Sequence, residues 1–128
     1  MLITALKKLK SFGFDPKNIL DIGANKGKWS IEVRKKVFPN AKYILIEAID
    51  YEELKKISAK NHNISFINLL LDDVEHNVTW YEKRNTGDSI YKENTSYFKD
   101  CEKIIKKTTT LDKSFPSNYD FDLIKIDC

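Results

Sequence analysis

The fold is decided by residues 18–27, which read NILDIGANKG. The first five residues form a short apolar run that is typical of a buried strand, and Gly23 ends this run. Gly23 permits a tight turn, and Gly27 lets the start of a helix pack close to the strand. Apolar residues then recur at helical spacing, at Trp29, Val33 and Val37. The segment therefore predicts a strand, a glycine turn and a helix.

The flanking sequence extends this pattern into an alternation of strands and helices. An amphipathic helix is expected over residues 2–12, and apolar runs predict strands over residues 42–47 and 64–71. Between these strands, Asp50 is expected to begin a helix with Glu53 as its capping-box partner. Such an alternation is typical of a doubly wound α/β fold with a parallel sheet.

The second half of the chain has a different pattern. Residues 78–81 and 103–111 favour extended structure, and the polar segment 83–100 between them predicts a long loop or an irregular hairpin. Residues 121–127 predict a last strand, which ends one residue before the chain stops. A covering helix normally follows such a strand. The sequence therefore predicts a single domain over residues 1–128 whose sheet is truncated at its C-terminal side.

Composition narrows the classes of function. The 128 residues include 41% hydrophobic and 32% charged residues, which is ordinary for a soluble globular domain. The net charge of +3 is small and its positive part is mostly Lys, so neither nucleic acid nor a membrane surface is an expected partner. No signal peptide or membrane-spanning apolar run is visible. The two cysteines and two histidines lack metal-ligand spacing, so a cytoplasmic protein without a metal site is expected.

Two features of the glycine turn bear on its ligand. Its pattern is G-x-x-x-G, whereas dinucleotide sites use G-x-G-x-x-G so that backbone amides can cradle a pyrophosphate. Asp21 precedes the first glycine by two residues. A carboxylate there repels a pyrophosphate but attracts the ammonium and sulfonium groups of S-adenosylmethionine. Since the turn lies where open α/β sheets bind nucleotide-like ligands, S-adenosylmethionine is favoured over NAD.

Two further acids follow predicted strands. Glu47 comes 20 residues after Gly27 (47 − 27), close to the spacing at which an acidic residue meets a ribose. Asp72 follows the third predicted strand, where its side chain could meet an adenine amino group. Acids at strand ends are also often helix caps or solvated loop residues, and this alternative stays open for both.

Four motifs together resemble the FkbM-type methyltransferases: DIGANKG at residues 21–27, IEA at 46–48, TLD at 110–112 and DLIKID at 122–127. The resemblance implies a Rossmann-like class I methyltransferase fold, a three-layer sandwich with a mainly parallel sheet. It also implies S-adenosylmethionine as methyl donor and O-methylation, often of a sugar hydroxyl in a glycan or natural product.

The resemblance also implies roles for individual residues. Glu47 would hold the ribose, and Asp72 would lie near the adenine. The methionine end would be lined by Asp21, Gly23, Asn25 and Gly27, and the cofactor-binding set would be completed by Ala24 and Ala48.

Asp127 is the candidate catalytic residue. It ends the last predicted strand beside the expected methyl position and could accept the proton of an acceptor hydroxyl. An equal alternative is that the carboxylate has no catalytic role and only contacts the ammonium group of the cofactor, or a metal or a loop that is missing from this chain. Lys125 shares a strand face with Asp127 and could pair with it or reach solvent. His76 could also act as a base, but its segment reads as a turn.

Two other classes of function stay open. The absent dinucleotide motif disfavours a nicotinamide-dependent oxidoreductase. A truncated, non-catalytic cofactor-binding or interaction module stays open because FkbM members continue past the position of Asp127 with a turn, a helix and further strands. The exposed edge of the last strand would favour a homodimer.

Overall fold

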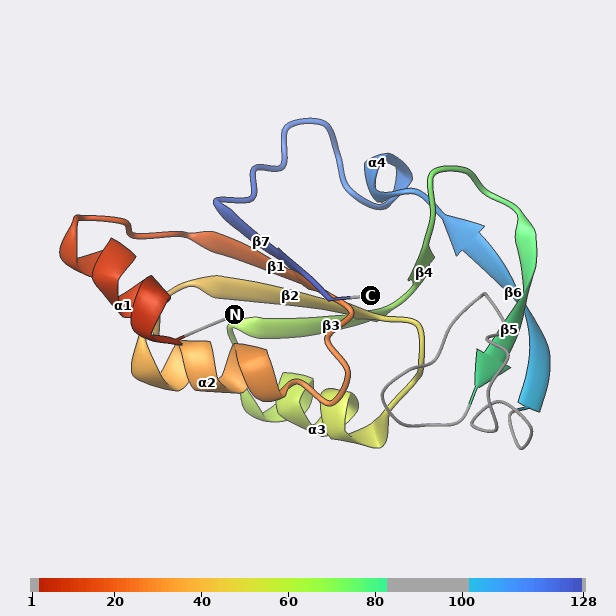
Figure 1. The fold of residues 1–128 in the computed structure, drawn as a ribbon, viewed down its shortest axis with the longest axis horizontal. Helices are drawn as coiled ribbons and strands as arrows, with labels where there is room; N and C mark the ends of the chain where they lie inside the picture. The colour runs from red at the N-terminus through yellow and green to blue at the C-terminus, as the bar shows by residue number, and fades with distance from the viewer. Residues whose placement is uncertain (1–2, 83–101, 128) are drawn as a thin grey trace. The chain divides into compact units, whose positions relative to one another are not determined.

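The computed structural model describes residues 3–82 and 102–127 (Figure 1). The chain forms two compact units, one of Met1–Asn68 with Tyr119–Cys128 and the other of Leu69–Asn118. Each unit has its own sheet. The first unit contains the glycine turn.

The first unit is built on a four-stranded sheet in the order β3-β2-β1-β7. All three pairings in it are parallel. The strands are β1 (Asn18–Ile22), β2 (Lys42–Glu47), β3 (Ile64–Asn68) and β7 (Leu123–Ile126). From β1 the chain moves outward through β2 to β3, and later returns to the other side of β1 as β7. The strand order therefore reverses beside β1, which is where open α/β sheets bind their ligands.

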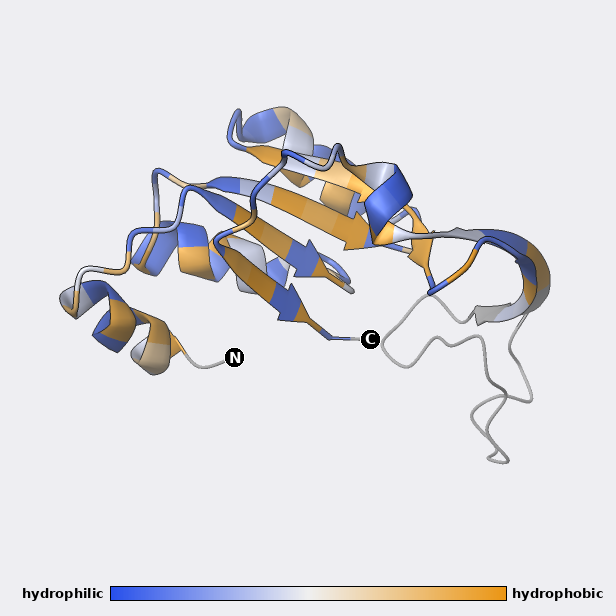
Figure 2. Cartoon of the chain, turned by 90° about the horizontal axis from the view of Figure 1, so that it is seen from above, coloured by the Kyte–Doolittle hydropathy of each residue, from blue (hydrophilic) through white to orange (hydrophobic). Residues whose placement is uncertain are grey.

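In the described part of this unit the helices are α1 (Ile3–Ser11), α2 (Lys28–Lys36) and α3 (Glu52–Lys60). Helices α2 and α3 lie on the same side of the sheet in Figure 1. The strands appear mainly in the colours of hydrophobic residues in Figure 2. The core of this unit includes the completely buried side chains of Ile19, Leu20, Val33, Leu45 and Leu54. Burial of such apolar side chains is the main driving force for folding.

The parallel sheet with flanking helices confirms the α/β, Rossmann-like class that the sequence predicts. The predicted elements over residues 2–12, 18–22 and 42–47 are present with nearly the same bounds. A helical layer on the opposite side of the sheet is not among the described residues of this unit. The three-layer arrangement therefore stays a prediction.

The predicted start of the third helix is wrong. Helix α3 begins at Glu52, and its N-cap residue Tyr51 makes no capping hydrogen bond through its side chain. The acids expected to form a capping box have other partners. Asp50 Oδ2 lies 2.9 Å from Lys55 Nζ, and Glu53 Oε2 lies 3.6 Å from Lys26 Nζ.

The predicted strand over residues 64–71 is also wrong in extent. It divides into β3 and β4 (Leu70–Leu71), which belong to different sheets. At the end of β3, Asn68 Nδ2 donates to the carbonyl oxygens of Glu47 and Ala48, at 3.0 Å each. The side chain of Asn68 thus binds the backbone that follows β2, at the point where β3 ends.

The second unit contains a three-stranded sheet in the order β4-β6-β5, with β5 at Asn77–Glu82 and β6 at Glu102–Thr109. Strand β6 pairs parallel to β4 and antiparallel to β5. The expected strands near 78–81 and 103–111 are confirmed, except that Leu111 begins a one-turn helix, α4 (Leu111–Ser114). Thr110 caps this helix, because its side chain accepts a hydrogen bond from the Lys113 amide at 3.2 Å.

The expected loop over residues 83–100 lies outside the described residues. Within the ranges 3–82 and 102–127, no helix has the length and apolar character needed to cross a membrane.

Candidate functional site

The glycine turn follows β1 directly and depends on unusual backbone conformations. Gly23, Asn25 and Gly27 have φ angles of 74°, 53° and 85°, all in the left-handed region. Such angles cost little for glycine and are tolerated by asparagine. The amides of Gly23 and Ala24 donate to the Ile46 carbonyl at 2.9 and 3.1 Å. These two hydrogen bonds hold the turn against the carboxyl end of β2.

Gly27 stands at the N-cap of α2 in tightly packed surroundings. A Cβ atom at this position would lie 2.8 Å from Ile57 Cδ1 and 3.2 Å from Leu54 Cδ2, both on α3. The backbone of the turn therefore lies so close to α3 that a side chain at residue 27 would require Ile57 and Leu54 to shift. This packing brings the free amides at the start of α2 to the carboxyl end of the sheet.

Glu47 links the glycine turn to the end of β2. Its Oε1 accepts a hydrogen bond from the Asn25 amide, and its Oε2 accepts one from the Ile49 amide, both at 2.9 Å. The carboxylate is therefore fixed at two points and cannot rotate freely. Because an ionised carboxylate offers about four acceptor positions, it can still accept hydrogen bonds from a ligand hydroxyl.

Asp21 lies one residue before the end of β1 and has 0% exposed surface. Its Oδ2 accepts a hydrogen bond of 2.7 Å from Ser30 Oγ on α2. Its Oδ1 lies 3.1 Å from Lys125 Nζ on β7, although the two are not aligned as a hydrogen bond. The contact is an ion pair, because opposite charges at that distance attract strongly whatever their alignment. The pairing follows from the register, in which Asp21 is the direct neighbour of Lys125.

Lys125 and Asp127 share a face of the last strand, as the sequence predicts. The Lys125 side chain is 10% exposed, and its ammonium lies 5.7 Å from the centre of the Trp29 ring. It also lies 3.8 Å from Asp127 Oδ2, whose side chain is 79% exposed. The Asp127 amide donates to the Ile22 carbonyl at 3.0 Å, so Asp127 stands beside the start of the glycine turn.

Most of the predicted site residues therefore gather in the first unit, at the carboxyl ends of β1, β2 and β7. These are Asp21, Gly23, Ala24, Asn25, Gly27, Glu47, Ala48 and Asp127. Sequence reasoning missed Lys125 as the partner of Asp21, since only the register of β7 on β1 reveals it. Asp72 lies in the second unit.

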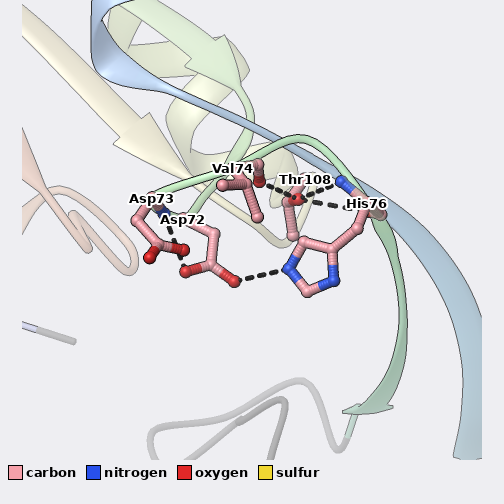
Figure 3. A network of polar contacts seen from close by, with 5 residues as sticks. All are labelled: Asp72, Asp73, Val74, His76 and Thr108. Atoms are coloured by element: carbon pink, nitrogen blue, oxygen red, sulfur yellow. Dashed lines mark hydrogen bonds and ion pairs between the residues drawn. The ribbon is translucent and has the colours of Figure 1, made fainter.

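In the second unit, Asp72 forms a local polar network with His76 (Figure 3). Asp72 Oδ2 lies 2.7 Å from His76 Nε2, and Asp72 Oδ1 accepts a hydrogen bond from the Asp73 amide at 2.8 Å. Both hydrogen bonds lower the pKa of the Asp72 carboxyl, and the one with His76 has the larger effect. Sequence reasoning missed this pair, because a spacing of four residues indicates a contact only on a helix and residues 72–76 are not helical.

Buried Thr108 on β6 completes the network. Its hydroxyl donates to the Val74 carbonyl at 2.7 Å and accepts from the His76 amide at 2.9 Å. The segment between β4 and β5 is thus fixed to β6 by a side chain with 1% exposed surface. Among the residues that the structure describes, no group of three metal-ligating side chains occurs.

Comparison with known proteins adds little to this geometry. No protein-family model matches the chain, and no curated protein matches it. A solved structure of the plantazolicin methyltransferase BpumL in complex with SAH is similar, with 22% sequence identity and a TM-score of 0.40. The match covers 56% of this chain and only 31% of that protein's chain. Because a likeness of this size carries no argument about activity, the fold class rests on the strand order of the chain itself.

Proposed function

We propose that this chain binds S-adenosylmethionine and belongs to a methyltransferase that acts on a hydroxyl group. The observation that carries the proposal is the double fixation of Glu47. Its carboxylate is held at the end of β2 by the amides of Asn25, in the glycine turn, and of Ile49. The glycine turn, with its left-handed residues, and the fixed carboxylate of Glu47 therefore lie side by side. They lie where the strand order reverses, which is where a nucleoside would bind.

The residues present fit the groups of this ligand. The carboxylate of Glu47 can accept hydrogen bonds from the two ribose hydroxyls. The free amides at the start of α2 can donate to the carboxylate of the methionine moiety, which the positive end of the α2 dipole also favours. The role of Asp72 near the adenine stays a prediction from the sequence, and the proposal does not depend on it. Bound S-adenosylmethionine supplies an electrophilic methyl group on its sulfonium.

The acceptor that we propose is a sugar or natural-product hydroxyl. The resemblance of residues 110–112 and 122–127 to the FkbM-type enzymes supports this choice. Two roles are open for Asp127, which has an exposed carboxylate beside the glycine turn. It can accept the proton of the acceptor hydroxyl, or it can bind the ammonium group of the methyl donor.

Isothermal titration calorimetry with S-adenosylhomocysteine and with NAD tests the proposal. We expect the chain to bind S-adenosylhomocysteine and not NAD. Glu47→Ala should weaken binding by about 10- to 100-fold, because a charge-assisted hydrogen bond contributes roughly 1.5–3 kcal/mol. Glu52→Ala is the matched control, since it removes an exposed carboxylate on α3.

Circular dichroism of both variants checks that the fold is retained, because Glu47→Ala also removes two acceptors of backbone amides. Binding of NAD alone would replace the methyl-donor proposal by an oxidoreductase. Unchanged affinity in folded Glu47→Ala would remove this residue from the ribose site. Transfer of a labelled methyl group to a panel of glycans then tests the acceptor.

A further inference from the structure

Asp21, whose carboxylate the sequence predicts to bind the methionine moiety of the cofactor, is not available to a ligand. Asp21 has no exposed surface, and both of its oxygens face groups of this chain. Ser30 Oγ lies 2.7 Å from Oδ2, and Lys125 Nζ lies 3.1 Å from Oδ1. To reach Asp21, the ammonium of a ligand would have to displace an ammonium that is covalently tethered to the neighbouring strand.

Lys125 is itself held on more than one side. Its ammonium lies 5.7 Å from the centre of the Trp29 ring, within the range of a cation–π interaction. With only 10% of its side chain exposed, this cation has little access to water and depends on Asp21 and Trp29. Displacing it would leave a poorly solvated charge, which is costly.

Asp127 has the opposite character. Its side chain is 79% exposed, and Lys125 Nζ lies 3.8 Å from its Oδ2, farther than from Asp21. The hydrogen bond of 3.0 Å from its amide to the Ile22 carbonyl places it beside Gly23, at the start of the turn. Among the described residues at this end of β1 and β7, Asp127 is therefore the carboxylate with free acceptor positions.

We infer that Lys125 is an internal counter-ion that withdraws Asp21 from the ligand, and that Asp127 binds the ammonium group of the methionine moiety. The inference rests on the proposed function and decides between the two roles left open for Asp127. Asp21 then has a structural role outside the ligand site: it pairs with Lys125 and accepts a hydrogen bond from Ser30, which the side-chain oxygen of an asparagine can also accept.

Calorimetry with two probes tests the inference: S-adenosylhomocysteine, which carries the ammonium, and 5′-methylthioadenosine, which lacks the whole amino-acid part. Asp127→Asn should weaken binding of S-adenosylhomocysteine about fivefold, as expected for an exposed ion pair, and leave binding of 5′-methylthioadenosine unchanged. Asp15→Asn is the matched control. It removes an exposed carboxylate that precedes β1, at the other end of the sheet, and should change neither affinity.

The double variant Asp21→Asn, Lys125→Met removes the internal pair without leaving one buried charge alone. It should bind S-adenosylhomocysteine as tightly as the wild type or a few-fold more tightly, since a cation that competes for Asp127 is gone. A loss of affinity for this probe in the double variant would make Asp21 the ligand carboxylate and overturn the inference.

An unchanged affinity for S-adenosylhomocysteine in Asp127→Asn would overturn the inference by itself, because a residue that only accepts the acceptor proton does not hold this probe. Since Asp127 is exposed, this variant decides the question even where the double variant does not fold. A wild-type chain that binds neither probe would overturn the proposed function together with the inference.

Discussion

Replacing Gly27 by alanine tests the packing on which the glycine turn depends. Gly27 has a φ angle of 85°, and its added Cβ would contact the side chains of Leu54 and Ile57. Gly13 provides a matched comparison, because its φ angle is 99° but no atom lies within 4 Å of an added Cβ. The two alanine variants share the backbone strain and differ in the contact with α3.

The magnitude follows from these two contributions. Left-handed backbone costs a residue with a Cβ roughly 1–2 kcal/mol, and this applies to both variants. The reduced freedom of the unfolded chain is also common to both and cancels in the comparison. Forcing an extra carbon into a packed core costs about 1–3 kcal/mol. The half-buried Ile57 can move its terminal methyl group, whereas completely buried Leu54 has little room.

We therefore take the lower end of the packing cost, about 1 kcal/mol. Gly13→Ala should lower the free energy of unfolding by about 1–2 kcal/mol, and Gly27→Ala by about 2–3 kcal/mol. Equilibrium unfolding in urea measures both values by linear extrapolation. A cost for Gly27→Ala no larger than that for Gly13→Ala would refute the close approach of the turn to α3.

Substitutions at three further contacts test other parts of the structure. Lys125→Met should destabilise the fold by about 3–5 kcal/mol in urea titrations, because it leaves the buried Asp21 carboxylate unpaired, and adding Asp21→Asn should recover most of that loss. Thr108→Val should cost about 1–3 kcal/mol more than Thr108→Ser, since it leaves the His76 amide without its acceptor. Backbone hydrogen bonds from residues 17 and 18 hold the pKa of Asp122 below its ordinary value of 3.8. Asp122 thus stabilises the fold above that pH and loses its effect as the pH falls through the lower folded-state pKa, so Asp122→Asn should flatten the acid side of the stability curve. Equal stability of Lys125→Met and the double variant, or of Thr108→Val and Thr108→Ser, would contradict the corresponding contact. An unchanged acid side of the stability curve in Asp122→Asn would contradict the hydrogen bonds to Asp122.

The first half of the fold could be predicted because its signals are local. The apolar run at residues 18–22 ends at Gly23, the run at residues 42–47 follows Pro39 and Asn40, and the helix between the two runs has apolar residues at regular spacing. The break between β3 and β4 could not be predicted. Leu69, Leu70 and Leu71 continue the apolar run, and no glycine or proline marks the point where the chain leaves the sheet.

The site was predictable as a set of strand-end residues but not in its pairing. Sequence periodicity places Lys125 and Asp127 on one strand face, yet it gives no information about the strand alongside. The partner of Lys125 depends on the register of β7 on β1, which sets Lys125 opposite Asp21. The carboxylate of Asp21, which the sequence predicts to face a cationic ligand, is therefore already paired with the ammonium of Lys125.

Titration of the isotopically labelled chain with S-adenosylhomocysteine, followed through the chemical shifts of the backbone amides, tests whether the glycine turn binds the methyl donor. We expect the largest changes in chemical shift at Asn25 and Ile49, whose amides donate to Glu47, and along the glycine turn from residue 23 to residue 27. No shifts in this region at saturating ligand, or shifts confined to other parts of the chain, would contradict a methyl-donor site at the glycine turn.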